Sequence, residues 1–223
     1  AKTVRGQTHF LKDFIDITRD LCISYKPNIS FFESYGIEGL KSLEEIIFHI
    51  NDHVPIIIDG KRGDIGNTSE KQAQYIYDYF KADACTLHPY MGIDSLEPFF
   101  KRKDKFNFVL GLTSNPSSVD FEELTLKSGK TLAEHIVEQC VEWNKTYTNI
   151  GVVVGASKQK LKQIRAISPD LMFLIPGVGQ QGGSYQDAHT YGKNSLDLAL
   201  INASRSILYA TNERSNMKKA IPK

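Results

Sequence analysis

The sequence has 223 residues, of which 41% are hydrophobic and 24% are charged, a composition typical of a globular protein with one sizeable core. Its 27 Lys and Arg side chains against 26 Asp and Glu side chains give a net charge of +1, which argues against a nucleic-acid-binding surface or an acidic tail. No run approaches the roughly 18 apolar residues of a membrane helix, the start AKTVRGQTHF has no apolar signal-peptide core, and three scattered cysteines predict neither a disulfide framework nor a zinc site. We therefore expect a cytoplasmic protein with no membrane or nucleic-acid partner.

Short apolar runs alternate with longer amphipathic segments along the chain. In chain order the short runs predict strands at 24–28, 55–59, 84–88, 108–113, 151–155, 173–176 and 206–209. The longer segments predict helices at 10–22, 37–50, 69–80, 95–101, 132–144 and 158–167. The predicted strands are almost continuously apolar, which is typical of parallel strands covered by helices. Because no linker-like stretch interrupts the pattern, we expect a single α/β domain over residues 1–223.

The number of strand–helix units indicates which α/β fold is present. A (β/α)8 barrel of about 250 residues uses roughly 31 residues per unit, so a chain of this length has room for about seven units. The chain also begins on a predicted helix with no strand before it. It is therefore either an open doubly wound sheet or a (β/α)8 TIM barrel that is N-terminally incomplete, its first strand absent from this chain. Polar residues follow many of the strands, and only a barrel brings all those ends to one mouth, so we favour the barrel.

The strand at 55–59 runs into the polar segment DGKRGDIGNT. Asp59 and Lys61 are two residues apart and are expected on the same face of the strand, and Gly63 permits a sharp turn before Asp64. Lys26, at the end of the preceding strand, adds a second ammonium group. A solvated surface turn is the alternative, but charges at the mouth of a barrel favour a functional cluster. Such an array is costly in a partly dry pocket unless its charges are paired.

Two neighbouring loops near the C-terminus have the features of a phosphate site. The segment GVGQQGG follows the strand at 173–176, and Asn202 to Arg205 lead toward the last predicted strand. Glycines allow backbone N–H groups to reach phosphate oxygens, and Arg205 offers a two-pronged, charge-assisted contact. In a barrel these loops form the usual phosphate-binding position.

The histidines and cysteines are weaker candidates. The histidines lack the spacing of a metal site, and we expect His88, at the end of the strand at 84–88, to pack or to form hydrogen bonds rather than to bind a ligand. Cys85 lies inside that apolar strand and is expected to be an inert core residue.

Several segments spread over nearly the whole chain form a recognisable set, namely KPNISFFESYG, IIIDGKRGDIGNT, DACTLHPYMGIDSLEPF, GLTSNPSS, IGVVVGAS, LIPGVGQQGG and NASRSILYA. Together, and in this order, they resemble the orotidine 5′-monophosphate decarboxylases, particularly their second sequence subgroup. The pattern D-x-K-x-x-D-I-x-x-T is specific in this context. The resemblance implies a (β/α)8 barrel that forms a homodimer with shared active sites. It also implies conversion of orotidine 5′-phosphate to UMP and CO2, in de novo pyrimidine synthesis, without a cofactor or a metal.

The family's motifs imply roles for individual positions. Lys61 resembles the proton donor to C6 of the pyrimidine and Asp59 the carboxylate beside the departing CO2, with Lys26 and Asp64 completing the charged network. Asp64, Ile65 and Thr68 are implied to reach the neighbouring subunit's site. The implied substrate contacts are Asn28 to the ribose, Ser114 with Thr113 to the pyrimidine edge, Pro176 in the base pocket, and Gln181 and Arg205, with Ser204, at the phosphate.

The sequence also departs from the family pattern. It has no G-L-D-P segment, with which the family's first strand ends, and His88 stands where the family usually has asparagine. In many eukaryotes this domain is fused behind a phosphoribosyltransferase, so a fused or associated orotate phosphoribosyltransferase is a candidate partner.

Alternative functions remain at this point. A hexulose-phosphate synthase-like barrel shares the D-x-K-x-x-D region and uses a metal ion, although the GLTSNP and PYMG segments favour the decarboxylase. A Schiff-base aldolase is disfavoured because carboxylates beside Lys61 would raise its pKa. A non-catalytic nucleotide-binding domain is the third alternative.

Overall fold

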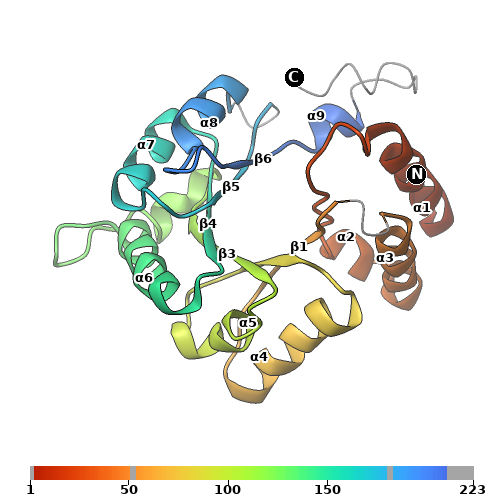
Figure 1. Ribbon diagram of the computed structural model, residues 1–223, viewed down its shortest axis with the longest axis horizontal. Coiled ribbons are helices and arrows are strands. Elements are labelled where there is room, and N and C mark those ends of the chain that lie inside the picture. Colours follow the sequence, from red (N-terminus) through yellow and green to blue (C-terminus); the bar gives the residue numbers. More distant parts are fainter. Residues whose placement is uncertain (1–2, 51–53, 180–182, 210–223) are drawn as a thin grey trace.

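The apolar runs of the sequence pair into one parallel sheet. The computed structural model describes residues 3–50, 54–179 and 183–209, and within them six strands are hydrogen-bonded in chain order. Their bounds are β1 (Ile57–Arg62), β2 (Ala84–Leu87), β3 (Phe106–Leu112), β4 (Ile150–Val154), β5 (Phe173–Pro176) and β6 (Leu200–Asn202). Figure 1 shows that the sheet is curled, with helices around its outside. The predicted α/β fold with parallel, helix-covered strands is confirmed.

The predicted strand at 24–28 lies along β1, on the side away from β2. It is reduced to two parallel bridges, Tyr25 with Ile56 and Asn28 with Asp59. The Ile57 N–H donates to the Tyr25 carbonyl at 2.9 Å, and the Asp59 N–H donates to the Pro27 carbonyl at 2.9 Å. This segment therefore extends the curled sheet beyond β1. The described residues supply no eighth strand.

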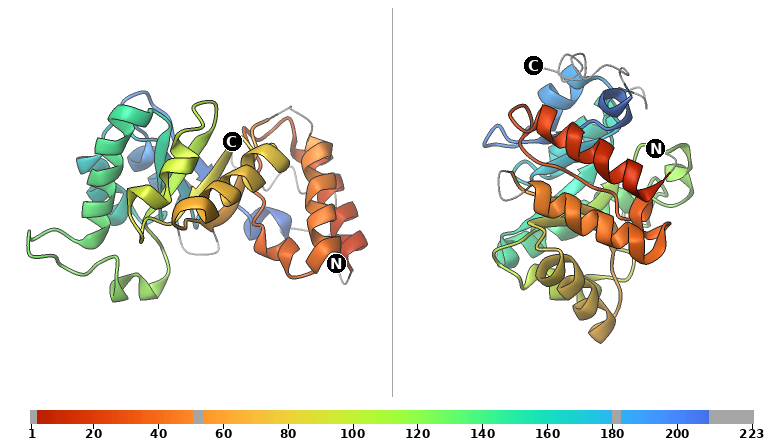
Figure 2. Two further views of the ribbon diagram at one scale, coloured as in Figure 1. Left: turned by 90° about the horizontal axis from the view of Figure 1, so that it is seen from below. Right: turned by 90° about the vertical axis from the view of Figure 1, so that its right-hand side faces the viewer.

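The chain begins with a helix, and further helices connect each strand to the next. Their bounds are α1 (Val4–Thr18), α2 (Ser30–Glu33), α3 (Gly36–Ile50), α4 (Gly66–Ala73), α5 (Glu97–Phe100), α6 (Leu132–Tyr147), α7 (Lys158–Ile167), α8 (Tyr185–Gly192) and α9 (Arg205–Leu208). The start of α6 is set by a capping box, in which Thr131 and Glu134 satisfy each other's backbone N–H groups. Both views in Figure 2 show α1 and α3 side by side, joined by the 2.9 Å ion pair of Lys12 with Glu45. Within the described ranges, no helix is both long and apolar enough to cross a membrane.

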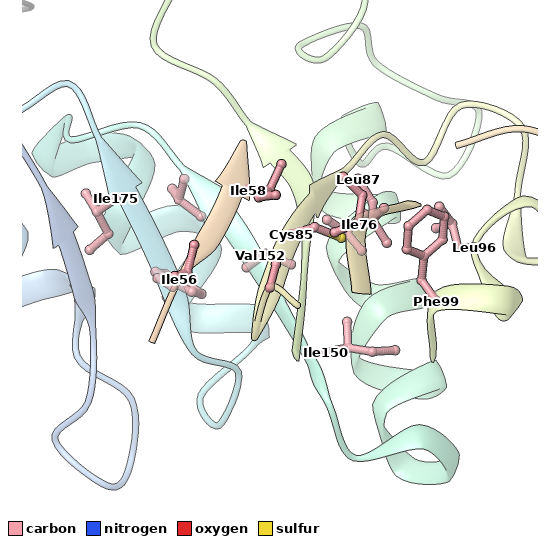
Figure 3. Close-up of a cluster of buried hydrophobic side chains, with 14 of the residues drawn as sticks. Ile56, Ile58, Ile76, Cys85, Leu87, Leu96, Phe99, Ile150, Val152 and Ile175 are labelled. Carbon is pink, nitrogen blue, oxygen red and sulfur yellow. The ribbon is translucent and has the colours of Figure 1, made fainter. Parts of the chain in front are cut away.

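Successive strand residues pack against opposite sides of the sheet. Ile56 and Ile58 belong to the larger core cluster, which fills the space between the sheet and the helices. Figure 3 shows part of this cluster, including Cys85 of β2 and the helical residue Ile76. Ile57 belongs instead to a smaller cluster on the inner face of the sheet. Burial of both faces explains why the strands are apolar without alternation.

One predicted strand is wrong. The segment 206–209 was expected to be the last strand because it is short, apolar and β-branched, but it lies in the helix α9 (Arg205–Leu208) and the residue after it. The last strand is instead β6 (Leu200–Asn202), which pairs with β5 from Leu174 to Pro176. Short apolar runs do not distinguish strand from helix by periodicity, and here pairing with β5 decides. Ser204 and Arg205 consequently follow the last strand rather than precede it.

The helix at 69–80 also differs from its prediction. It begins earlier, as α4 (Gly66–Ala73), and continues as one π-helical segment from Gln74 to Tyr79. The first helix begins at Val4 and ends at Thr18 rather than covering 10–22. By contrast, α7 and β5 have the predicted bounds.

Candidate active site

The strand β1 carries a largely buried carboxylate between two ammonium groups. Lys26 Nζ donates to Asp59 Oδ2 at 2.8 Å, and Lys61 Nζ donates to Asp59 Oδ1 at 2.6 Å. The Asp59 and Lys26 side chains are only 11% and 12% exposed, whereas that of Lys61 is 47% exposed. The structure thus brings Lys26, Asp59 and Lys61 together, and Lys61 is the member that solvent or a ligand reaches most easily.

The two ammonium groups determine the protonation state of Asp59. Burial alone would raise the pKa of this carboxyl group, but the charges and hydrogen bonds of Lys26 and Lys61 outweigh burial and lower the pKa to about 2. Asp59 is therefore ionised throughout the neutral range. With two cations around one anion, the cluster has an excess positive charge that favours an additional anionic group.

The backbone at the end of β1 is irregular. Ile58 pairs with Cys85 and Arg62 pairs with Leu87, so Asp59, Gly60 and Lys61 lie opposite Thr86 alone. Lys61 has φ +45°, a left-handed conformation that is unfavourable for a residue with a side chain. The Asp59 and Lys61 side chains meet, as the sequence predicted, but through this bulge rather than through a regular pleat.

Two further side chains complete the surroundings of Asp59. Asn28 Nδ2 lies 3.4 Å from Asp59 Oδ2, so this predicted site residue is part of the cluster. The Thr86 hydroxyl donates to Asp59 Oδ1 at 2.9 Å. Sequence reasoning missed Thr86, although it is a polar residue within the otherwise apolar strand A-C-T-L.

In the loop after β1, Asp64 bonds to its neighbour in sequence rather than to the cluster. Its Oδ1 accepts the N–H of Ile65 at 2.8 Å, and no ion pair joins it to Lys61 among the described residues. Ile65 is 60% exposed, and Thr68, in the first turn of α4, is exposed too. The structure therefore does not bring Asp64, Ile65 or Thr68 to the Asp59 cluster of the same chain.

His88 supports the same loop. Its ring Nε2 lies 3.0 Å from the carbonyl oxygen of Gly63, and its backbone N–H donates to the Arg62 carbonyl at 3.0 Å. A Cβ atom on Gly63 would lie 2.9 Å from the His88 carbonyl oxygen, so the close contact requires glycine. His88 has the hydrogen-bonding role expected of it. Cys85, in β2 just before His88, is fully buried, and burial raises the pKa of its thiol to about 12, which leaves the thiol inert.

The loop after β3 is held by a separate polar network. The Thr113 hydroxyl donates to Glu122 Oε1 at 2.8 Å, and Lys160 Nζ donates to the Thr113 carbonyl at 2.9 Å. Ser114 is exposed and lies against Gly155 at the end of β4, where an added Cβ would be 2.8 Å from that of Ser114. Thr113 is thus bound to Glu122, while Ser114 lies on the surface of the loop.

The loops after β5 and β6 lie against each other, as a phosphate site would require. Gly179 has φ +86°, and a Cβ there would lie 3.1 Å from the Cβ of Ser206 in α9. Arg205 is the first residue of α9 and is exposed, and the Ser204 carbonyl accepts the N–H of Ile207 at 3.0 Å. Because β6 ends before Ser204, both predicted phosphate ligands are at the carboxyl end of the strand.

Two other predicted substrate contacts remain. Pro176 is the last residue of β5, half-buried, and its carbonyl accepts the Ala156 N–H at 3.1 Å. Gln181 lies outside the described residues. No group of three or more His, Cys, Asp or Glu side chains that could hold a metal ion occurs in the described part of the chain.

Comparison with known proteins gives consistent matches. The model of the "Orotidine 5′-phosphate decarboxylase / HUMPS family" matches residues 5–220. The orotidine 5′-phosphate decarboxylase of Porphyromonas gingivalis is 43% identical over 214 residues, which cover 95% of this chain and 78% of that protein. The enzyme of the same name from Flavobacterium johnsoniae is 42% identical over 215 residues, with the same coverage of 95% and 78%.

Solved structures agree with these sequence matches. The Leishmania donovani OMP decarboxylase superposes with a TM-score of 0.91 at 36% identity, covering 99% of this chain and 87% of that one. The Leishmania donovani UMP synthase gives a TM-score of 0.92 at 38% identity, covering 98% of this chain and 49% of that one.

Proposed function

The chain belongs to the orotidine 5′-phosphate decarboxylase / HUMPS family, and we propose that Asp59 and Lys61 carry out its reaction. That reaction is the decarboxylation of orotidine 5′-phosphate in pyrimidine biosynthesis, the activity for which relatives matching most of the chain are named. The assignment of residues is carried by one observation, the Asp59 carboxylate held between the ammonium groups of Lys26 and Lys61 at 2.8 and 2.6 Å.

The chemistry requires a charged proton donor beside C6. When the bond from C6 to the carboxylate carbon breaks, CO2 leaves and the electron pair stays on C6, in the plane of the ring and outside its π system. The Lys61 ammonium stabilises this developing charge and donates its proton to C6, after which solvent reprotonates the amine. Asp59, ionised because of its low pKa, lies beside the substrate carboxylate and disfavours that like charge before CO2 leaves. Lys26 keeps Asp59 ionised and oriented. These steps use only the chain's own residues and need no cofactor.

The loops around this cluster have the features to bind the rest of the substrate. Asn28, within hydrogen-bonding distance of Asp59, is proposed to contact the ribose. At the pyrimidine we propose Thr113, Ser114 and Pro176. The phosphate is assigned to Ser204 and Arg205 of the α9 end, together with Gln181. The contact of Gly179 with Ser206 supports the phosphate position, because it brings the glycine-rich loop against the start of α9.

We assign the residues of the DIxxT segment to a second active site in a homodimer. Ile65 and Thr68 are exposed on their own chain, Asp64 is half-buried, and no ion pair links Asp64 to Lys61 among the described residues. An Asp64 carboxylate from a partner would supply the additional anion that two lysines around Asp59 favour.

We regard residues 1–223 as one decarboxylase domain acting in the cytoplasm. The buried free thiols of Cys85 and Cys140 suit a reducing compartment. A fused or associated orotate phosphoribosyltransferase is the proposed partner, supported by the match to a UMP synthase of which this chain covers 49%.

The test is direct. The purified chain is given orotidine 5′-phosphate, and the loss of substrate absorbance is followed with and without EDTA. Turnover that EDTA does not affect supports the proposed mechanism. Turnover lost with EDTA would point to a metal-dependent reaction of the hexulose-phosphate synthase kind, and nucleotide binding without turnover would point to a non-catalytic domain.

A further inference from the structure

Thr86 of β2 occupies a special position in the sheet. Because of the bulge at the end of β1, it is the one β2 residue opposite Asp59, Gly60 and Lys61. Its residue exposure is 2%, so its hydroxyl group has to find hydrogen-bond partners within the protein. The partners it finds are both in the Asp59–Lys61 segment.

The direction of the two hydrogen bonds follows from their chemistry. The backbone N–H of Lys61 donates to Thr86 Oγ1 at 3.0 Å. Since a hydroxyl group has one proton, and a carboxylate only accepts, that proton goes to Asp59 Oδ1 at 2.9 Å. Thr86 therefore joins the backbone of Lys61 to the carboxylate of Asp59.

The bridge acts where the backbone is least favourable. Lys61 is left-handed, with φ +45°, a conformation that persists only when its surroundings hold it. Because the bulge interrupts the pairing between β1 and β2, the side chain of Thr86 takes the Lys61 N–H. Asp59 Oδ1, which accepts the hydrogen bond from the Thr86 hydroxyl, also accepts one from Lys61 Nζ at 2.6 Å. One hydroxyl group thus constrains both ends of the Asp59–Lys61 pair.

We propose that Thr86 is a positioning residue for the decarboxylation, because its hydroxyl fixes the Lys61 backbone and the Asp59 carboxylate relative to each other. This inference rests on the proposed roles of Asp59 and Lys61. Proton transfer depends steeply on placement of the donor, and misplacement by about 1 Å costs about 100-fold in rate. Thr86 itself touches no reacting atom.

The expected effect is on turnover rather than on binding. Thr86→Val keeps the β-branched shape but removes the hydroxyl, which leaves the Lys61 N–H without its partner. We expect kcat to fall about 10- to 100-fold, the range for a lost hydrogen bond to a charged group. KM and the affinity for UMP should stay within about threefold of wild type, because the proposed phosphate and ribose contacts are made by other residues.

The decisive measurement is the order of activities in a set of variants. Thr86→Ser keeps the hydroxyl and loses the methyl group, so a positioning role predicts that it turns over faster than Thr86→Val. A role in packing alone predicts the opposite order. Should Thr86→Val fail to fold, Thr86→Ser and Thr86→Ala give the same comparison, since both lack the methyl group and they differ only in the hydroxyl.

A matched control separates this effect from a general loss of stability. Thr8 of α1 is also buried, and its hydroxyl contacts the Val4 carbonyl at 2.9 Å and Ser42 Oγ at 2.6 Å, within the α1–α3 pair. Thr8→Val should lower the melting temperature without changing kcat. Wild-type kcat in folded Thr86→Val, or equal kcat in Thr86→Ser and Thr86→Ala, overturns the inference. Full turnover by Lys61→Ala would instead overturn the proposed function, so the two failures are distinguishable.

Discussion

The two lysines around Asp59 differ in a way that separates their roles. The Lys26 side chain is almost as buried as that of Asp59, with 12% exposure against 11%, so its charge mainly neutralises the Asp59 carboxylate. Lys61 is 47% exposed and has the rotational freedom of a long side chain, so it reaches toward a ligand while it contacts Asp59. At the scale of single residues, the difference in exposure favours Lys61 over Lys26 as the proposed proton donor.

The first prediction concerns Lys61. Lys61→Ala should reduce decarboxylation to the detection limit, because it removes the group proposed both as the cation beside C6 and as the proton donor to C6. UMP should still bind, since the proposed phosphate and ribose contacts are made elsewhere. Absorbance measures turnover, and titration calorimetry measures UMP binding. Lys41→Ala, which removes an exposed lysine of α3 paired with Glu38, is the control and should be fully active. Substantial turnover by Lys61→Ala would remove Lys61 from the mechanism.

A second prediction follows from the pKa of Asp59. A carboxyl group with a pKa of about 2 in the folded protein and about 3.9 in the unfolded chain stabilises the fold above the higher value. This contribution, about 2 kcal/mol, is lost as the pH falls from about 4 toward 2. Urea unfolding of wild type and of Asp59→Asn at pH 5, 4 and 3 measures it. The free energy of unfolding should fall more steeply for wild type, because the asparagine does not titrate. Parallel curves would show that Asp59 has an ordinary pKa.

At the scale of the elements, the sequence predicted those helices and strands that local patterns determine better than those that depend on strand pairing. The amphipathic pattern of 158–167 and the apolar run of 173–176 match α7 and β5 in both bounds, because nearby residues determine each. The short run at 206–209 is compatible with a strand or a helix. Because β6 takes the place beside β5, this run is left outside the sheet and lies in α9. A local sequence pattern does not specify which distant segment a strand pairs with.

The site residues likewise fall into those that spacing in the sequence predicts and those that depend on strand pairing. The sequence predicted the contacts of Asp59 with both lysines. Asp59 and Lys61 are two residues apart in one strand, and Lys26 lies at the end of the strand before it. Thr86 was missed because its contacts depend on a bulge that sets one β2 residue opposite Asp59 through Lys61. Asp64 was grouped with the cluster by its spacing, yet within its own chain it bonds to the N–H of Ile65.

The third prediction belongs to the β6–α9 element. Arg205 is exposed at the first position of α9, next to the glycine-rich loop. Arg205→Ala should cost about 3 kcal/mol of transition-state stabilisation with orotidine 5′-phosphate, because a charge-assisted contact to phosphate is lost. With orotidine, which lacks the phosphate, the variant and wild type should have nearly equal kcat/KM. An equal loss with both substrates would place Arg205 outside the phosphate site.

At the scale of the whole molecule, the positions of Asp64 and Ile65 favour an active site built by two chains. Ile65 is 60% exposed just before α4, beside the Asp64 carboxylate, which has no ion pair among the described residues. Contact with a second chain would cover the isoleucine and bring the carboxylate to an excess of positive charge. A C2 dimer does this twice, because each chain gives and receives the same segment.

The last prediction tests this shared site by complementation. If Lys61 serves its own pocket and Asp64 serves the partner's, Lys61→Ala and Asp64→Asn chains each supply what the other lacks. When the two inactive variants are unfolded, mixed equally and refolded, about half of the dimers are mixed, and each mixed dimer has one pocket with both residues and one with neither. Activity should therefore return to roughly one quarter of the wild-type value. Each variant refolded alone is the control and should stay inactive. If both residues served the same pocket, every pocket would carry one lesion, and mixed dimers confirmed by differently tagged chains would remain inactive.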